Sequence, residues 1–566
     1  MNMGRSFWTV SGVLVAVLFF RVSSGLDHTD EMQYYGQLIG LLEQGRLFSN
    51  DLFVQQTVWL PLYPVFWLYY FFLGEAYLIF FARAFMALMI FGLFVFAVNR
   101  FRKLEFDMAL ASLTAFCLTF AVTHHNIFAV SYNTLSQFLW IGFLLHYLNW
   151  RPDQKSALEN YFVPAALSFL AAFAYPPSAV IMAFLIIMRH LVERRWHILP
   201  PLLVVYAICI FAGGGLALWF TTPDAFLRAL TFSQGYGVGG AIFVHRNVLM
   251  TFSMLIFFLF ASMFVPKHRF ADLYIYFAFA MLVALGWRLV SGDIRSLGAT
   301  SSIILQAMAC GAFSAYLGAI GENRQARWLI VSLIAASIGF VLTSSNGFAA
   351  MYASVGLVLP FLMLLGLHHF GLRLGFGKSE FAKISALPPI LMSLILLLSW
   401  STHPYRSLPW YQHTQAVAGI APIFAGLRTD PQTLEFFGFA QKTFEQVSDK
   451  KVLIAGRYPS LYFALNAQPT TCMFYMHSIG SPQSADALTG CLRDKPMPEY
   501  VLLISHDEKD PFYPNLRTML SGALGLKPSN CVEFRHENTG FYGSIPYART
   551  DIYNLCQTFD AAGRPN

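Results

Sequence analysis

Long apolar runs separated by short polar loops occupy residues 1–401 of the chain. A helix that crosses a membrane needs about 20 mostly apolar residues. Thirteen runs approach that length, and no small-residue cleavage site follows the first, so we expect it to be retained. The predicted membrane helices lie near residues 7–24, 76–98, 108–124, 131–149, 161–175, 178–189, 199–220, 247–265, 271–290, 297–319, 328–345, 350–370 and 385–401.

Basic residues gather in every second loop, and this asymmetry predicts the orientation of the chain in the membrane. The loop between residues 25 and 57, by contrast, has Arg46 as its only basic residue beside several acids. The N-terminus is therefore predicted to be cytoplasmic. An odd number of helices then places residues 402–566 on the opposite side. The basic loops contain Arg100, Arg102 and Lys103; Arg151 and Lys155; Arg189, Arg194 and Arg195; Lys267 and Arg269; Arg324 and Arg327; Arg373, Lys378 and Lys383.

A further apolar stretch, residues 58–73, would break this alternation if it crossed the membrane. It contains Pro61 and Pro64 and is rich in Trp and Tyr. Such aromatic residues favour the membrane–water interface. We expect a helix that lies on the outer face and completes a first external loop at residues 25–75.

The composition changes after residue 401, although the whole chain is only 12% charged and 56% hydrophobic. Residues 451–456 and 500–505 read as strands, and residues 459–466 and 515–524 as helices. This alternation is typical of a small α/β domain. The predicted fold is a polytopic α-helical membrane protein (residues 1–401) with a C-terminal soluble α/β domain (residues 402–566).

Four of the seven cysteines lie in this C-terminal region, which suggests disulfides in an oxidising compartment. Three connectivities are open to four cysteines. We favour Cys472–Cys491 and Cys531–Cys556, because these pairs close short loops. Another small feature, Gly213-Gly214-Gly215 within a predicted helix, suggests close helix packing.

The stretch from Asp27 to Tyr35 follows the first membrane helix directly and carries the adjacent acids Asp30 and Glu31. A carboxylate at the membrane rim loses part of its water and needs partners. It can also take a proton from a hydroxyl group. The plainer interpretation is a polar loop that caps a helix, with Asp27 or Thr29 as the N-cap.

Other polar residues are predicted to meet this stretch at the outer face. Arg83 lies about two turns inside the second helix, where a cation needs an anionic partner. Arginine binds phosphate well, although a side chain that reaches the lipid headgroups is the alternative. No metal site is predicted, because adjacent histidines on a helix chelate poorly. The remaining candidates are His28, Tyr34, His124, His125, Tyr132, Asn133, Tyr236, His245, Arg246 and Arg295.

This layout resembles the GT-C glycosyltransferases, in particular the protein O-mannosyltransferases and the bacterial aminoarabinose lipid A transferases. Five short stretches carry the resemblance. One of these stretches departs from the family pattern, because members often have an acid where this chain has Asn133, and an amide cannot act as an acid. The stretches are Thr29-Asp30-Glu31 with Tyr34-Tyr35, Pro61-Leu62-Tyr63-Pro64, Ala82-Arg83, Ser131-Tyr132-Asn133-Thr134-Leu135 and Tyr458-Pro459-Ser460-Leu461-Tyr462-Phe463.

The resemblance implies transfer of a hexose or pentose from a polyprenyl-phosphate donor, with inversion, at the periplasmic face of a bacterial inner membrane. Asp30 would be the base, with Glu31 orienting it or the acceptor. Arg83, Arg246, Arg295 and His245 would hold the lipid phosphate. The substrate pocket would include Asp27, His28, Tyr34, His124, His125, Tyr132, Asn133 and Tyr236.

The implied partners are membrane lipids, the donor and a glycan or glycolipid acceptor such as lipopolysaccharide or O-antigen, without nucleic acid. An upstream donor synthase and a flippase would complete the pathway. No cofactor is implied, and a divalent metal is left open. Two alternatives remain: an O-antigen ligase or polymerase that uses a lipid-diphosphate donor, and a transporter of lipid-linked sugars, which would favour broken helices and internal repeats.

Overall fold

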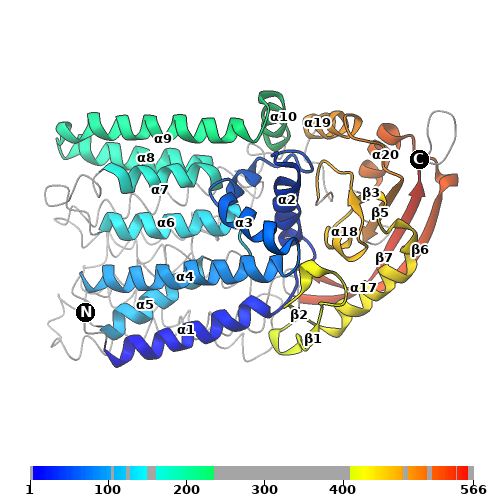
Figure 1. Ribbon diagram of the computed structural model, residues 1–566, viewed down its shortest axis with the longest axis horizontal. Coiled ribbons are helices and arrows are strands. Elements are labelled where there is room, and N and C mark those ends of the chain that lie inside the picture. Colours follow the sequence, from blue (N-terminus) through cyan, green and yellow to red (C-terminus); the bar gives the residue numbers. More distant parts are fainter. Residues whose placement is uncertain are drawn as a thin grey trace, which may run out of the picture.

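Apolar helices lie side by side in one half of the molecule, and a helix-flanked sheet forms the other half (Figure 1). The computed structural model describes residues 4–103, 108–122, 128–148, 161–234, 408–474, 476, 482–506, 513–542 and 545–558. Predicted membrane segments from residue 247 to residue 401 lie outside these ranges. The C-terminal half described below is mixed α/β, as the sequence pattern predicts.

Seven helices of the apolar half match the first seven predicted membrane segments. Three described helical segments, Arg5–Ser23, Leu78–Arg102 and Trp196–Trp219, are long and apolar enough to cross a membrane. Helix α1 begins at the end of the bundle farthest from the sheet (Figure 1). The seven helices are α1 (Arg5–Ser23), α4 (Leu78–Arg102), α5 (Met108–Ala121), α6 (Tyr132–Leu148), α7 (Val163–Ala174), α8 (Pro176–Val192) and α9 (Leu199–Trp219).

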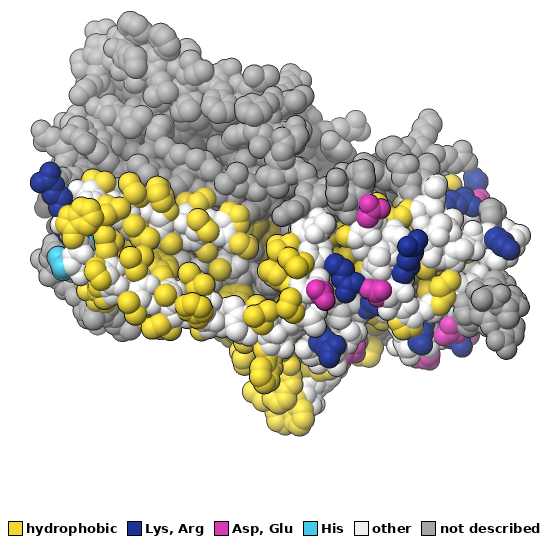
Figure 2. Space-filling model, turned by 90° about the horizontal axis from the view of Figure 1, so that it is seen from above, with side chains coloured by type: hydrophobic (Ala, Val, Ile, Leu, Met, Phe, Trp, Pro, Cys, Tyr) yellow, Lys and Arg dark blue, Asp and Glu magenta, His cyan; other side chains and the backbone are white. Residues whose placement is uncertain are grey.

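Helix α1 shows how an apolar sequence divides between protein and lipid. Phe7, Leu14 and Leu18, spaced by helical turns, are buried, whereas Trp8 and Phe19 on the other face are exposed. Exposed apolar side chains cover the bundle in Figure 2, while charged side chains are spread over the other half. This distribution suits lipid around the bundle and water around the sheet.

The close helix packing predicted for Gly213-Gly214-Gly215 is confirmed at Gly213. A Cβ atom at Gly213 in α9 would lie 2.4 Å from the ring of Phe169 in α7. Glycine therefore allows α7 and α9 to approach each other here. Among the described residues, nothing lies within 4 Å of a Cβ atom placed at Gly214 or Gly215.

The first external loop folds into two helices and a 3-10 turn at the junction between the two halves. Helix α2 (Asp30–Gln44) runs across the ends of the bundle helices, and η1 (Val54–Trp59) follows it (Figure 1). Gly45 ends α2 in the left-handed region, with φ of 63°.

Helix α3 (Tyr63–Leu73) confirms the expected short helix in the stretch 58–73. At 1.5 Å per residue, its length is roughly 16 Å, too little to cross a bilayer. Trp67, Phe71 and Phe72 are exposed, and Figure 2 shows an apolar projection at the junction, where α3 stands forward in Figure 1. These side chains suit the interface position predicted for this helix.

The C-terminal half is built on a five-stranded sheet in the order β4-β3-β5-β7-β6. Strand β3 pairs in parallel with β4 and β5, whereas β7 is antiparallel to both β5 and β6. The elements are α10 (Pro223–Gln234) at the end of the bundle, then β1 (Gln415–Ala416), β2 (Arg428–Thr429), α17 (Pro431–Thr443), β3 (Lys451–Ala455), α18 (Ser460–Ala464), β4 (Gln468–Pro469), α19 (Pro482–Arg493), β5 (Tyr500–His506), α20 (Tyr513–Leu524), β6 (Cys531–Tyr542) and β7 (Ile545–Gln557).

Helices cover both faces of this sheet, which explains the continuous apolar runs in β3 and β5. Val452 and Ile454 of β3 belong to the core on the α17 side, and Leu453 and Ala455 to the core on the α19 and α20 side. The four predicted elements of this region, two strands and two helices, are confirmed within a few residues. Both favoured disulfides, Cys472–Cys491 and Cys531–Cys556, are also present.

The core on the α17 side continues into the bundle. One cluster of buried apolar side chains includes Phe94 of α4, Tyr35 of α2, Phe437 of α17 and Ile454 of β3. Backbone hydrogen bonding adds to this contact, because Gly25 N donates to Arg428 O at 2.9 Å. The two halves are thus packed together through the first external loop.

Candidate active site at the start of helix α2

A buried ion pair fixes the first turn of α2 to helix α4. Arg83 Nε donates to Glu31 Oε1 at 2.8 Å, and Arg83 Nη2 to Glu31 Oε2 at 2.6 Å. The guanidinium also donates to three carbonyls at the end of α1: Val22 and Ser24 from Nη1, and Gly25 from Nη2. All five N–H groups of Arg83 therefore have acceptors within the protein.

This arrangement corrects the role predicted for Arg83. An arginine that binds a lipid phosphate needs N–H groups free to point at it, and Arg83 uses all of its own on Glu31 and the carbonyls. Arg83 and Glu31 instead join α2, α4 and the end of α1. Glu31 is 1% exposed, so of its two predicted roles burial favours the orientation of Asp30 over contact with an acceptor.

Asp27 caps the same turn. Its Oδ1 accepts from Thr29 N at 3.0 Å and from Thr29 Oγ1 at 2.6 Å, and its Oδ2 accepts from Glu31 N at 3.0 Å. The carboxylate thus accepts hydrogen bonds from N–H groups at the helix start, and its negative charge is stabilised by the positive end of the helix dipole. Thr29 occupies the N-cap position, as one of the two predicted alternatives, and the capping carboxylate comes from Asp27. The contact of Asp27 with substrate stays a prediction.

Asp30 is the first residue of α2, directly beside the fixed Glu31, and is half-buried. Its charge acts on the phenols of Tyr34 and Tyr132, and the side chain of Asn133 lies beside both phenols. The structure therefore brings together Asp30, Tyr34, Tyr132 and Asn133, all four of which the sequence singled out. They come from α2 and from the start of α6.

Aromatic stacking orders this cluster. The rings of Tyr34 and Tyr132 meet edge to face at 6.0 Å, and Tyr132 stacks on Tyr175 at 5.7 Å with an interplanar angle of 7°. Burial, reinforced by Tyr132, Asp30 and Asp27, raises the pKa of Tyr34 well above its usual value, so this phenol remains a neutral hydrogen-bond donor. Sequence reasoning missed Tyr175, which nothing distinguishes from the many other aromatic residues.

His28 faces the α/β half rather than the tyrosine cluster. Its Nδ1 lies 3.1 Å from Ser460 Oγ, its Nε2 lies 3.4 Å from Thr433 Oγ1, and its ring packs edge-on against Phe436 and Phe437. Burial lowers the pKa of His28 to about 4, with Asp430 opposing the shift and Arg549 adding to it. We assign His28 to the contact between the two halves, in place of the predicted contact with substrate.

Among the described residues, no group of three or more His, Cys, Asp and Glu side chains could hold a metal ion. The predicted site residues outside the described ranges are His124, His125, Tyr236, His245, Arg246 and Arg295.

Comparisons with known proteins give a distant structural likeness. No family model matches the sequence, and no curated protein matches it. Among solved structures, the chain is similar to the crystal structure of ArnT from Cupriavidus metallidurans bound to undecaprenyl phosphate, with 13% sequence identity and a TM-score of 0.41. The match covers 97% of this chain and 98% of the other. At this distance it assigns no role to any residue of this chain.

Proposed function

We propose that the protein is a membrane glycosyltransferase that moves a sugar from a polyprenyl-phosphate donor to a hydroxyl group of an envelope glycan or glycolipid. Asp30 is the general base of this reaction. The observation that carries the proposal is the fixed start of α2. The buried pair Glu31–Arg83 holds this turn while the neighbouring Asp30 stays half-exposed.

A general base needs a defined direction and access to the proton that it removes. Asp27 and Glu31 hold the backbone around Asp30, and Tyr34 supplies a neutral donor nearby. Tyr132 and Asn133 offer further polar groups to a sugar hydroxyl. Such a cluster, with one half-exposed carboxylate, suits a transfer to an alcohol acceptor.

The reaction would be a single displacement. The acceptor oxygen attacks the anomeric carbon as Asp30 takes its proton, and the bond from that carbon to the phosphate oxygen breaks. The electron pair leaves with the polyprenyl phosphate, and the configuration at the anomeric carbon inverts. Arg246, Arg295 and His245 remain our candidates for the groups that stabilise the leaving phosphate.

We place this chemistry at the periplasmic face of a bacterial inner membrane. The start of α1 and the ends of α4 and α8 lie at the bundle end opposite the α/β half (Figure 1). Basic residues occur at these ends in sequence, as expected for the cytoplasmic side: Arg5 begins α1, Lys103 follows α4 and Arg194 follows α8. Two disulfides in the α/β half favour an oxidising compartment beyond the membrane. A lipopolysaccharide or O-antigen glycan is then the acceptor within reach.

Replacing Asp30 by Asn tests the proposal. Because the amide cannot accept the acceptor proton, we expect sugar transfer to fall by about 100-fold or more. The measurement is the sugar composition of lipopolysaccharide and other envelope glycans in a deletion strain complemented with each variant at equal protein level. The wild-type gene is expected to restore a missing sugar branch, and Asp30→Asn is not.

Asp224→Asn is the matched control, because Asp224 is an exposed acid in the first turn of another helix, α10, at the same end of the bundle. It is expected to restore the branch fully. Full restoration by Asp30→Asn would remove this residue from the role of base. An unchanged glycan composition in the deletion strain would contradict the transferase itself.

A further inference from the structure

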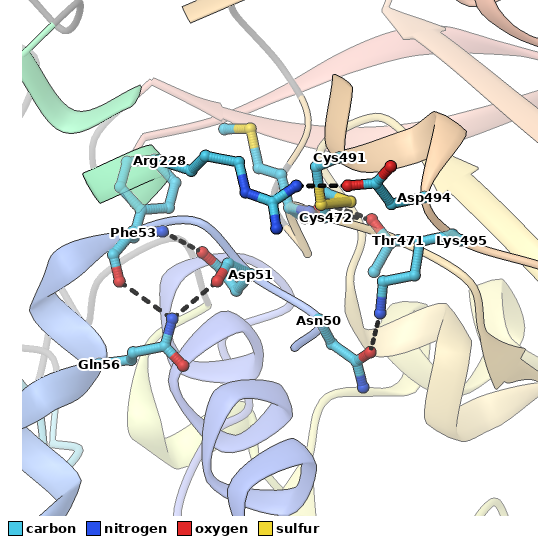
Figure 3. The surroundings of a disulfide bond; sticks show 11 residues. Asn50, Asp51, Phe53, Gln56, Arg228, Thr471, Cys472, Cys491, Asp494 and Lys495 are labelled. Atoms are coloured by element: carbon cyan, nitrogen blue, oxygen red, sulfur yellow. Dashed lines mark hydrogen bonds and ion pairs between the residues drawn. A yellow bond between two sulfur atoms is a disulfide. The ribbon is translucent and has the colours of Figure 1, made fainter. Parts of the chain in front are cut away.

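The loop that follows α2 meets a disulfide-bonded segment of the α/β half (Figure 3). Leu52 N donates to Cys472 O at 2.9 Å, and Phe474 N donates to Asp51 Oδ2 at 3.4 Å. Cys472 is bonded in turn to Cys491 in α19. Residues 50–53 of the first external loop and residues 471–474 of the α/β half therefore lie against each other across the junction.

Asp51 is the centre of this contact. Its Oδ2 also accepts from Gln33 Nε2 at 3.2 Å, and its Oδ1 accepts from Phe53 N at 2.7 Å. Gln37, one turn after Gln33 in α2, also lies beside this carboxylate. One buried side chain, 1% exposed, thus joins α2, its own loop and the segment after Cys472.

Two further observations show that the contact is tight. A Cβ atom at Gly36 of α2 would lie 2.8 Å from the ring of Phe474, so the helix and the segment touch where the side chain is absent. Beyond α19, Lys495 Nζ donates to Asn50 Oδ1 at 2.9 Å, and Arg228 of α10 pairs with Asp494 (Figure 3). The segment is held by α2 on one side and by the disulfide on the other.

We propose that Asp51 and the Cys472–Cys491 disulfide together position α2, and with it Asp30, against the α/β half, so that sugar transfer requires both. The proposal builds on the transferase function above. Asp51 is a positioning residue, because it contacts α2 rather than substrate. A displacement of about 1 Å at a reacting group can lower the rate by about 100-fold, so a loosened α2 would slow the chemical step.

The chain supplies a matched pair of variants. Cys472→Ala/Cys491→Ala removes the bond beside Asp51, whereas Cys531→Ala/Cys556→Ala removes a bond between β6 and β7, at the edge of the sheet opposite β4. The first readout is hydrogen exchange at the backbone of residues 30–44 in the purified full-length protein. The second readout is the rate of sugar transfer in the complemented strain. With the donor and acceptor that the glycan analysis of the deletion strain identifies, kcat and donor KM are then measured separately on the purified protein.

For the first double variant we expect exchange in α2 to rise at least tenfold and kcat to fall about 10-fold to 100-fold, with donor KM within about twofold of the wild type. The second double variant is expected to leave exchange in α2 and kcat within about twofold. Unchanged exchange in α2 after loss of Cys472–Cys491, or equal loss in both double variants, would overturn the proposal.

Asp51→Ala keeps both disulfides and repeats the test if the first double variant does not accumulate. It is expected to raise exchange in α2 and lower kcat in the same way, and wild-type values in both would overturn the proposal. Hydrogen exchange needs no activity. A failure of the transferase function, seen as an active Asp30→Asn variant, is therefore separate from a failure of the positioning contact.

Discussion

At the scale of single residues, the burial of Asp51 makes the stability of the folded protein depend on pH. Burial raises the pKa of Asp51 to about 6, although hydrogen bonds from Phe53, Gln33, Gln37 and Phe474 oppose the shift. A raised pKa means that the folded state prefers the protonated acid. The stabilisation is fully present below the ordinary pKa, near 4, and is lost as pH rises through about 6.

Asp51→Asn should remove this dependence, because the amide has no proton to lose. Between pH 4 and pH 6.5 we expect the wild type to lose stability relative to Asp51→Asn, by up to about 3 kcal/mol. The measurement is thermal unfolding of both proteins in detergent across this range. His28, whose pKa is lowered to about 4 by burial, changes stability in the opposite direction, so only the difference between the two proteins is informative. A difference in stability between the two proteins that stays constant across this pH range would contradict the raised pKa of Asp51.

At the scale of elements, the ion pair Glu31–Arg83 holds the first turn of α2 against α4. Removing one partner leaves the other buried and unpaired, which costs about 3–5 kcal/mol. We therefore expect Arg83→Met and Glu31→Gln each to lower the unfolding free energy by that amount, and the double variant to lose clearly less than the sum. Additive losses in thermal unfolding of the three variants would mean that the two side chains act separately.

The apolar pattern predicts most elements here, because each depends on neighbours in sequence. The strands at residues 451–455 and 500–506 and the short helix α3 follow from local composition. Disulfide pairing follows from loop length. The partner of Arg83 does not follow from the local sequence, because Glu31 lies 52 residues away in the chain. From the sequence alone, an arginine at that depth could equally bind a phosphate.

The same limit applies to the site. Asp30, Tyr34, Tyr132 and Asn133 stand out in sequence as polar groups beside membrane helices, and the fold brings them together. Asp51 looks like any other acid of an external loop. Its importance arises only when the segment after Cys472 covers it, a contact between residues more than 400 positions apart.

At the scale of the whole molecule, the continuous core argues against an independent C-terminal domain. Phe436, Phe437 and Tyr458 of the α/β half are buried in the cluster that extends into the bundle, and all three rings contact His28 of the first external loop. Residues 402–566 expressed alone would expose these side chains to water. At roughly 2 kcal/mol for each ring, the isolated fragment should unfold at least about 10 °C below the same region in the full chain.

Two measurements on fragments check this expectation. Thermal unfolding of residues 402–566 gives the unfolding temperature of the isolated fragment. Hydrogen exchange at the backbone of β3 and β5, followed as the temperature rises, gives the temperature at which the same region opens within the full-length protein. The fragment should also co-purify with co-expressed residues 1–401, because the exposed rings find their native partners there. Asp51→Ala in the larger fragment should weaken this association, whereas Asp224→Asn should not. A fragment that unfolds at the temperature of the full chain and does not bind the bundle would show that the shared core contributes little, and the control of α2 by the α/β half would then need another physical cause.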